Sequence, residues 1–421
     1  MTGMVSRIWW ALMAAAVLVQ VFVPPFVGLA DNADFGKVTG VFGMGAPLEL
    51  QRRFVAPVYT VEERYAWWDS PFRSSERVLA GIAVGVAKVL SPDGAMDIRV
   101  MGAVHAALLL TVFWVLLPEL GRVGAVAAAI FADVLHASHR NTFHMDVAAL
   151  LGLLAMVGFY LRASRTRRWV DWTGFLAGSA MLVLSKTAHA PLGVVLAMVA
   201  LAFRRYVVAG AWLAGAGWMF AGTPAEYPPM AAYNVVFFRM LPDSRSPEAN
   251  LAELGMDPAL KRYSGTFVYE PRSGLHGPRH ARQSLPAGAV LFAPPADRLA
   301  PMEIAMNEGS RLRHLVGNST PGSGRAEYEE SRSFTQWSGP KRRVFEGRAS
   351  LLTVVAAILC ALSAAQAIRA PGLAPLYLAP PAMGAAELLI AGLADTLEVA
   401  RHMSLFHAIF DLLVVLPPWA V

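Results

Sequence analysis

Residues 8–37 of the chain read IWWALMAAAVLVQVFVPPFVGLADNADFGK, a long apolar run that ends at two aspartates. The apolar part, residues 8–29, is about as long as the roughly 20 residues that a helix needs to cross a bilayer. Asp31 and Asp34 follow it directly, where such a helix would meet water. Carboxylates are costly to place at the edge of a membrane, so the stretch predicts a span that leads into a chemically active loop.

The rest of the chain has the composition of a polytopic membrane protein. Of its 421 residues, 56% are hydrophobic and only 16% are charged, which lies outside the usual range for soluble proteins. The net charge is +6, but the basic residues are not gathered into one tract, so no nucleic-acid partner is expected. The one cysteine, Cys360, excludes an intramolecular disulfide. The lipid bilayer is therefore the expected partner along most of the chain.

The apolar runs predict an all-α fold, a bundle of roughly ten transmembrane helices, because only helices satisfy their own backbone groups segment by segment in lipid. The first run is expected to be retained, since it is long for a secretory signal and contains Pro24 and Pro25 near its end. Residues 74–90 are too short for a comfortable span and predict an interfacial helix. The expected spans are residues 8–29, 98–117, 123–135, 147–161, 172–184, 192–203, 207–220, 349–368, 373–393 and 403–416.

Basic residues set the expected orientation. Short arginine-rich loops follow two of the spans, and the positive-inside rule makes such loops cytoplasmic. The opposite turns hold acids, histidines and a lysine, so the sequence predicts a protein of the cytoplasmic (inner) membrane whose site faces outside. The basic loops contain Arg162, Arg165, Arg167, Arg168, Arg204 and Arg205.

The chain is expected to have three parts. Residues 1–221 form an N-terminal transmembrane module whose first outer loop, residues 31–75, carries the acidic stretch. Residues 222–347 are rich in proline, glycine and charge without a long apolar run, and we expect them to form a larger extracytoplasmic loop or small domain. Residues 348–421 form the C-terminal transmembrane helices.

Eight polar residues are expected to converge at the outer end of the bundle, because charged groups at membrane depth are rare and by default mark a site. The two aspartates are the expected catalytic pair, with Asp31 as the general base. For Asp34, capping a helix N-terminus is the alternative. The other six are expected to bind substrate: His144, Asp146, Lys186, His189, Arg401 and His402.

The two cations of this set have two open readings. Lys186 and Arg401 either reach out to lipid headgroups or bind a phosphate or pyrophosphate, for which the planar fork of arginine is well suited. Glu398 lies three residues before Arg401 and could pair with it instead.

No cofactor is established by the sequence. A divalent metal, Mg or Mn, would find its candidate ligands in Asp34, His144 and Asp146, although two neighbouring ligands alone do not define such a site. His136 and His139 are weaker candidates for metal ligands. Asp133 lies inside an expected span, and we expect it to bond to a neighbouring helix.

The stretch from Asp31 to Lys37 resembles the acidic first-loop motif, of the Asp-Glu-x-x-Phe/Tyr type, in GT-C-fold glycosyltransferases, which use sugars linked to lipid phosphates. Asp31 falls on the first acid of that motif. The second position holds Asn32 rather than an acid, and Asp34 is the nearest replacement.

Further segments are similar, in the same order, to bacterial GT-C hexose transferases of the surface-layer-glycan type. The resemblance implies inverting transfer of a hexose from a polyprenyl-phosphate donor to a glycan or lipid-linked acceptor on the outer face. Asp31 would deprotonate the acceptor hydroxyl while Lys186 and Arg401 stabilise the leaving phosphate. The similar segments are residues 131–133, 141–146, 185–192, 233–234, 251–258 and 401–402.

Two other functions fit the same composition. A transporter or flippase for a lipid-linked glycan or solute would use acids and histidines to carry protons, and it would place them near the bilayer midplane in broken helices. Most polar clusters here lie at span ends, which favours the transferase. An inactive scaffold of a glycan assembly complex is the third alternative.

Overall fold

The computed structural model describes residues 2–24, 27–28, 34–47, 49, 56–62, 72–91, 93–225, 227–268, 270, 331–393 and 399–416. Asp31 and Glu398 lie outside these residues. What was expected of them therefore stays a prediction.

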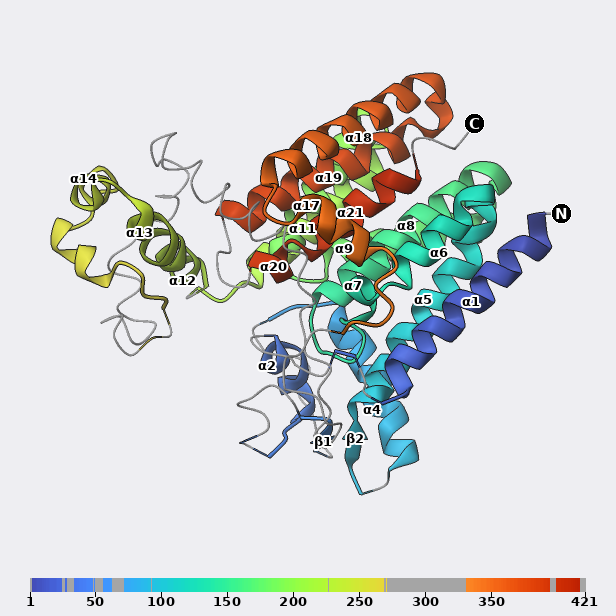
Figure 1. Ribbon diagram of the computed structural model, residues 1–421, viewed down its shortest axis with the longest axis horizontal. Helices are drawn as coiled ribbons and strands as arrows, with labels where there is room; N and C mark the ends of the chain where they lie inside the picture. The colour runs from blue at the N-terminus through green and yellow to red at the C-terminus, as the bar shows by residue number, and fades with distance from the viewer. Residues whose placement is uncertain are drawn as a thin grey trace.

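All ten apolar runs contain helices, which pack into a bundle (Figure 1). Their side chains are mostly Ala, Leu and Val, so little competes with the internal hydrogen bonds of each helix. The longer helices are α1 (Thr2–Phe22), α5 (Ile98–Leu120), α8 (Asp146–Thr166), α18 (Ala349–Arg369) and α19 (Ala374–Leu393). The shorter ones are α6 (Gly124–Phe131), α9 (Trp169–Val183), α10 (Pro191–Ala202), α11 (Tyr206–Ala221) and α21 (Ser404–Val415).

Fewer of these helices than expected are long enough to span. Five stretches in the described part of the chain are long and apolar enough to cross a membrane, or six if α9 and α10, bent by 117° at their junction, count as one span. Helices α9, α10, α11 and α21 have 15, 12, 16 and 12 residues. At about 1.5 Å per residue they fall short of a bilayer core of about 30 Å. The described residues therefore do not confirm the expectation of roughly ten full spans.

The helical stretch from α5 to α6 reverses direction. The rings of Phe113 and Phe131 lie 5.7 Å apart, whereas residues 18 positions apart in one straight helix would be separated by about 27 Å. Gly121, with φ of +58°, permits the reversal because it has no Cβ, and the turn η2 (Gly121–Val123) follows it. This confirms that the chain turns between the expected spans at residues 98–117 and 123–135.

The expected span at residues 123–135 is interrupted after Phe131. Asp133 begins α7 (Val134–Ala137), a single turn, by accepting a hydrogen bond from the N–H of Leu135 (2.8 Å). The chain from Ala132 to Met145 is buried, so protein surrounds its irregular backbone. Asn141 holds this segment against the end of α1 by donating to the carbonyl of Val21 (3.0 Å).

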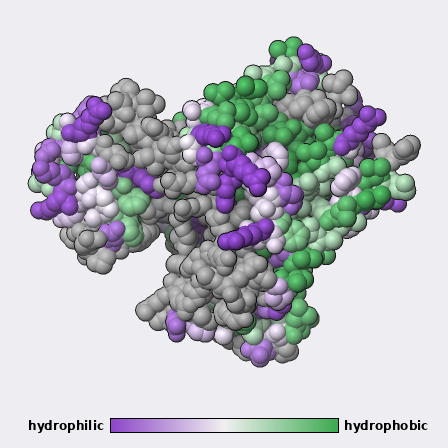
Figure 2. Space-filling view, viewed as in Figure 1, coloured by the Kyte–Doolittle hydropathy of each residue, from purple (hydrophilic) through white to green (hydrophobic). Residues whose placement is uncertain are grey.

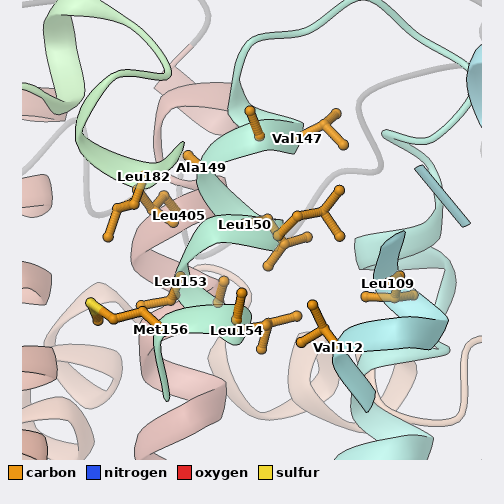
Figure 3. Close-up of a cluster of buried hydrophobic side chains, with 14 of the residues drawn as sticks. Leu109, Val112, Val147, Ala149, Leu150, Leu153, Leu154, Met156, Leu182 and Leu405 are labelled. Atoms are coloured by element: carbon orange, nitrogen blue, oxygen red, sulfur yellow. The ribbon is translucent and has the colours of Figure 1, made fainter. Parts of the chain in front are cut away.

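Helix α8 forms the centre of the core, as Figure 3 shows for its contacts with α5, α9 and α21. Its first dozen residues are all buried. Glycines bring α8 and α9 into close contact, since a Cβ on Gly152 would lie 2.6 Å from the backbone nitrogen of Leu182. Small residues serve the same purpose in other membrane helix pairs.

Short elements cover one end of the bundle. They are α2 (Phe35–Thr39), the turn η1 (Gly40–Phe42), β1 (Val58–Thr60) and β2 (Ala95–Asp97), with α4 (Glu76–Leu90) as the expected interfacial helix. The two strands pair antiparallel, with Val58 opposite Asp97. Phe35, Tyr59 and Phe143 pack their rings together at 5.2 to 5.5 Å and fix these elements to the bundle.

The described part of residues 222–347 has two components. A lobe with its own apolar cluster lies beside the bundle, at the left of Figure 1. It contains α12 (Tyr227–Tyr233), the π-helix η4 (Asn234–Met240), α13 (Leu241–Asp243), α14 (Pro247–Glu253) and η5 (Pro258–Tyr263). Helix α17 (Ser338–Phe345) instead packs on the bundle. Figure 2 shows hydrophobic surface over the bundle, while hydrophilic residues gather on the lobe.

Candidate functional site

Seven of the eight expected site residues meet at one end of the bundle, and the eighth, Asp31, lies outside the described residues. They come from four segments far apart in sequence: the start of α2, the start of α8, the break between α9 and α10 with its turn η3 (Thr187–His189), and α20 (Val399–His402). All seven are at least nine-tenths buried. They are Asp34, His144, Asp146, Lys186, His189, Arg401 and His402.

Arg401 joins two of these segments. Its Nη1 donates to Asp34 Oδ2 (2.8 Å) and to His144 Nδ1 (3.0 Å). Because a guanidinium only donates, His144 Nδ1 must be the unprotonated, accepting nitrogen. Lys37 Nζ approaches the other oxygen of the same carboxylate at 3.3 Å. Asp34 therefore holds two cations in place.

Asp34 is ionised at neutral pH. Burial by itself raises the pKa of this carboxyl, but the charges of Arg401 and Lys37 hold the pKa well below its usual value. A group with so low a pKa is a poor general base near pH 7. The capping alternative is wrong for Asp34, because its side chain makes no hydrogen bond to the start of α2.

Asp146 is the centre of a second set of contacts. Its Oδ1 accepts from Lys186 Nζ (2.9 Å) and faces His189 Nε2 (3.1 Å). Lys186 also donates to His402 Nδ1 (3.1 Å). The other ring nitrogen of His189 faces Glu387 Oε1 at 2.9 Å. When both carboxylates are ionised, both ring nitrogens donate, and the ring is an imidazolium.

The two central cations do not reach out to headgroups. The side chains of Lys186 and Arg401 are only 6% and 4% exposed and lie against carboxylates, so the snorkelling alternative is wrong for both. Buried ion pairs of this kind fix charge in a defined position.

Sequence reasoning missed several residues of this region. Glu387 lies within an expected span, where it is the one charged residue of α19; a lone carboxylate in an apolar run was the available signal. Lys37 lies within the short helix α2, Arg73 precedes α4 and Tyr227 begins α12, and no spacing rule marked them.

A hollow opens beside these residues, with about 410 Å³ of space between atoms, part of it open to solvent. Among the described residues, four cations line it, Lys37, Arg73, Lys186 and Arg401, against the single carboxylate of Asp34. With His402 neutral, the formal charge of this lining is four minus one, or +3. An anionic ligand fits such a surface.

The outer cations of the hollow are held by aromatic rings. Arg73 lies 4.4 Å from the ring centroid of Trp218 and donates to its carbonyl. Lys37 lies over the ring of Tyr227 at 5.2 Å. The segment before α4 is fixed by Ser75, whose N–H donates to the carbonyl of Leu184 at the end of α9 (2.7 Å). These contacts hold the charges in place before a ligand arrives.

The candidate metal ligands do not form a metal site among the described residues, where no three His, Cys, Asp or Glu side chains come close enough to hold an ion. Asp34 Oδ2 and His144 Nδ1 lie 3.9 Å apart, but both bond to the guanidinium of Arg401. A cation placed there would be repelled.

Three further buried carboxylates join segments of the bundle. Glu76 of α4 faces His105 Nε2 (2.7 Å) and accepts from the N–H of Ala148 in the first turn of α8 (3.0 Å). Asp133 bonds to a neighbouring helix as expected, since it accepts from the N–H groups of Trp337 and Ser338 at the start of α17 (2.7 and 2.9 Å).

The third of these carboxylates, Asp411, forms an ion pair between two helices. Asp411 of α21 accepts from Lys341 of α17 (2.6 Å) and faces His136 Nε2 (3.0 Å). Helix α17 is therefore tied to the bundle by contacts at its first and second turns.

Comparison with known proteins identifies one family. The model described as the YfdI N-terminal transmembrane domain matches residues 3–285, about two thirds of the chain. No curated protein and no solved structure is significantly similar to the chain.

Proposed function

The chain belongs to the family of the YfdI N-terminal transmembrane domain, and on that footing we propose that it is an integral membrane glycosyltransferase. It transfers a hexose from a polyprenyl-phosphate donor to a glycan or lipid-linked acceptor. The observation that carries the proposal is the hollow lined by four cations and one carboxylate at the end of the bundle.

The cations suit the phosphate of such a donor. Arginine can bind a phosphate through two parallel hydrogen bonds, and lysine supplies a compact charge. Arg401 and Lys186 are each paired with one buried carboxylate, at 2.8 and 2.9 Å, so their positions are set before the substrate binds. Fixed charges of this kind stabilise the negative charge that grows on the leaving phosphate.

The reaction needs a base as well. The acceptor oxygen forms a bond to the anomeric carbon of the hexose, the bond from that carbon to the phosphate oxygen breaks, and the polyprenyl phosphate leaves with the electron pair. The hydroxyl proton passes to a carboxylate. We assign that role to Asp31 on the resemblance of its motif, and we assign to Asp34 the positioning of Arg401, because its low pKa suits it to holding a cation.

The proposed orientation puts the hollow on the outer face of the inner membrane. Asp146 begins α8 beside the hollow, and the arginine-rich loop follows the other end of the same helix. At 21 residues, α8 separates the two by about 30 Å. Basic short loops on the opposite side fit the positive-inside rule.

The test is hexose transfer by purified protein from a panel of polyprenyl-phosphate sugars. Arg401→Gln is expected to lower the rate by about 10² to 10³, as is typical for loss of one donor to a developing anion. Arg122→Gln, an exposed arginine at the α5–α6 turn, is the matched control and should keep wild-type activity. Equal rates for the two variants would refute the role of Arg401.

One observation favours a transporter or flippase as the second function. Helices α9 and α10 form a pair bent by 117°, and Lys186 lies at the break, as ionisable residues do in many transporters. Protein-dependent uptake of a solute or lipid-linked glycan into vesicles, with no glycan product, would support this function over transfer.

A further inference from the structure

A second and larger hollow lies at the other end of the bundle. It contains about 1930 Å³ of space between atoms, part of it open to solvent, and runs between α8 and α9 on one side and α10, α11 and α19 on the other. Arg167, the residue that ends α8, lines its rim. The rim of this hollow is thus about one bilayer core away from the cation-lined site at the start of α8.

Its walls are apolar and aromatic. Tyr160 and Trp172 pack edge to face at 5.8 Å, and Phe175 and Trp212 do so at 5.9 Å. The indole N–H of Trp212 donates to Ser179 (3.1 Å), which fixes the ring in the wall. Such a surface is suited to a hydrocarbon chain rather than to a polar ligand.

The length of the groove matches one leaflet of a membrane. Along α8 its lining runs from Met156 to Arg167, eleven positions apart and so about 16 Å in length. Half of a bilayer core is about 15 Å. A chain that enters at the rim would therefore end near the middle of the bilayer.

Two guanidinium groups stand at the rim. Neighbouring Arg162 and Arg165 already have acidic partners, Asp171 at 3.3 Å and Glu119 at 2.7 Å. In the part of the chain that the structure describes, no carboxylate lies within 4 Å of Arg167 or Arg205, which both line the groove. The rim therefore carries uncompensated positive charge.

We propose that this groove binds an anionic phospholipid of the adjoining leaflet. One acyl chain lies along the aromatic wall, and the phosphodiester headgroup bonds to Arg167 and Arg205. A zwitterionic lipid brings its own cation and matches the rim less well. A polyprenyl chain that needs more than one leaflet would exceed the length of the groove.

Tryptophan fluorescence tests the proposal with the full chain in phosphatidylcholine vesicles. The vesicles contain a fixed small fraction of lipid with brominated acyl chains, carried either on phosphatidylglycerol or on phosphatidylcholine, and bromine quenches nearby indoles. Quenching by the anionic lipid should exceed that by the zwitterionic one. With about 1 kcal/mol for each of the two interfacial arginines, the preference corresponds to a relative affinity of about thirtyfold.

Variants show whether the preference arises in this groove. The double variant Arg167→Gln with Arg205→Gln should abolish the preference for the anionic lipid. The double variant Trp172→Phe with Trp212→Phe should remove the excess quenching by the anionic lipid, because these two indoles line the groove. Trp9→Phe, at a 37% exposed position on α1, is the control and should leave the preference unchanged. Equal quenching by both lipids, a preference that survives loss of both arginines, or displacement of the anionic lipid by equimolar polyprenyl phosphate would overturn the proposal.

Discussion

Replacing Lys186 by methionine removes the cation from a buried ion pair and leaves Asp146 without its closest charged partner. The two groups lie 2.9 Å apart, and their side chains are 6% and 2% exposed. His189 Nε2 stays 3.1 Å from the same carboxylate oxygen but is shared with Glu387.

The size of the effect follows from that burial. Removing one partner of a buried pair costs about 3 to 5 kcal/mol, because the remaining charge is desolvated without compensation, while replacing both partners is often close to neutral. Lys186→Met alone should therefore be strongly destabilising. Lys186→Met combined with Asp146→Asn should lose about 1 to 3 kcal/mol less than the sum of the two single variants, which is the coupling expected between groups in contact.

Thermal unfolding in detergent, followed by monomer recovery in size-exclusion chromatography, measures both effects. Transfer activity should be lost in the single and in the double variant, because Lys186 is placed on the phosphate. A double variant that is as unstable as the sum of the single variants would refute the pairing, whereas a stable and active Lys186→Met would refute both the pairing and the catalytic role.

Burial and the nearby His144 lower the pKa of His139 from 6.5 to about 3 in the folded protein. Between these two pH values the unfolded chain binds the proton more readily than the folded protein does. The contribution of neutral His139 to the free energy of unfolding is therefore complete above pH 6.5 and is lost as the pH falls toward 3. His139→Gln should reduce the decrease in the free energy of unfolding between pH 7 and pH 4.5, by at most about 1.4 kcal/mol per pH unit. Thermal unfolding at the two pH values measures this change, and an unchanged pH dependence would contradict the burial argument. Glu387→Gln removes a charge-assisted bond to His189, so we expect a loss of about 1.5 to 3 kcal/mol in the same assay, and no loss would show that the bond does not form. Gly152→Ala should destabilise the protein by about 1 to 3 kcal/mol, because the added Cβ would lie 2.6 Å from a backbone atom. The control Gly210→Ala should be neutral, because nothing lies within 4 Å of its added Cβ. Equal effects of the two substitutions would contradict the close contact between α8 and α9.

The positions of the helices could be predicted because apolar runs are read directly from the sequence. Their lengths could not, since an apolar run need not be helical throughout. The run at residues 123–135 shows why: Asp133 is a strong helix N-cap residue, and it ends one helix and begins another inside the run. The strands β1 and β2, of three residues each, are too short to give an alternating pattern.

The candidate site could be predicted in part from topology. Counting crossings placed Asp34, Asp146, Lys186 and Arg401 at one end of the bundle, where the structure has them. Which acid pairs with which base depends on how α2, α8 and α20 pack, and residues separated by up to 367 positions carry no local signal of their contact. Glu387 was passed over because its helix was read only as a span.

The central claim is that the cation-lined hollow performs hexose transfer, and one measurement tests it most directly. Purified protein is mixed with a polyprenyl-phosphate hexose and an acceptor, and the initial rate of product formation is compared for the wild type and Asp31→Asn. We predict that the wild type forms an inverted glycoside and that the variant, while still folded, is slower by about 10² to 10⁴, the usual contribution of a general base. Transfer at the wild-type rate by Asp31→Asn would contradict the assignment of the base, and absence of product from every donor in the panel would contradict the function.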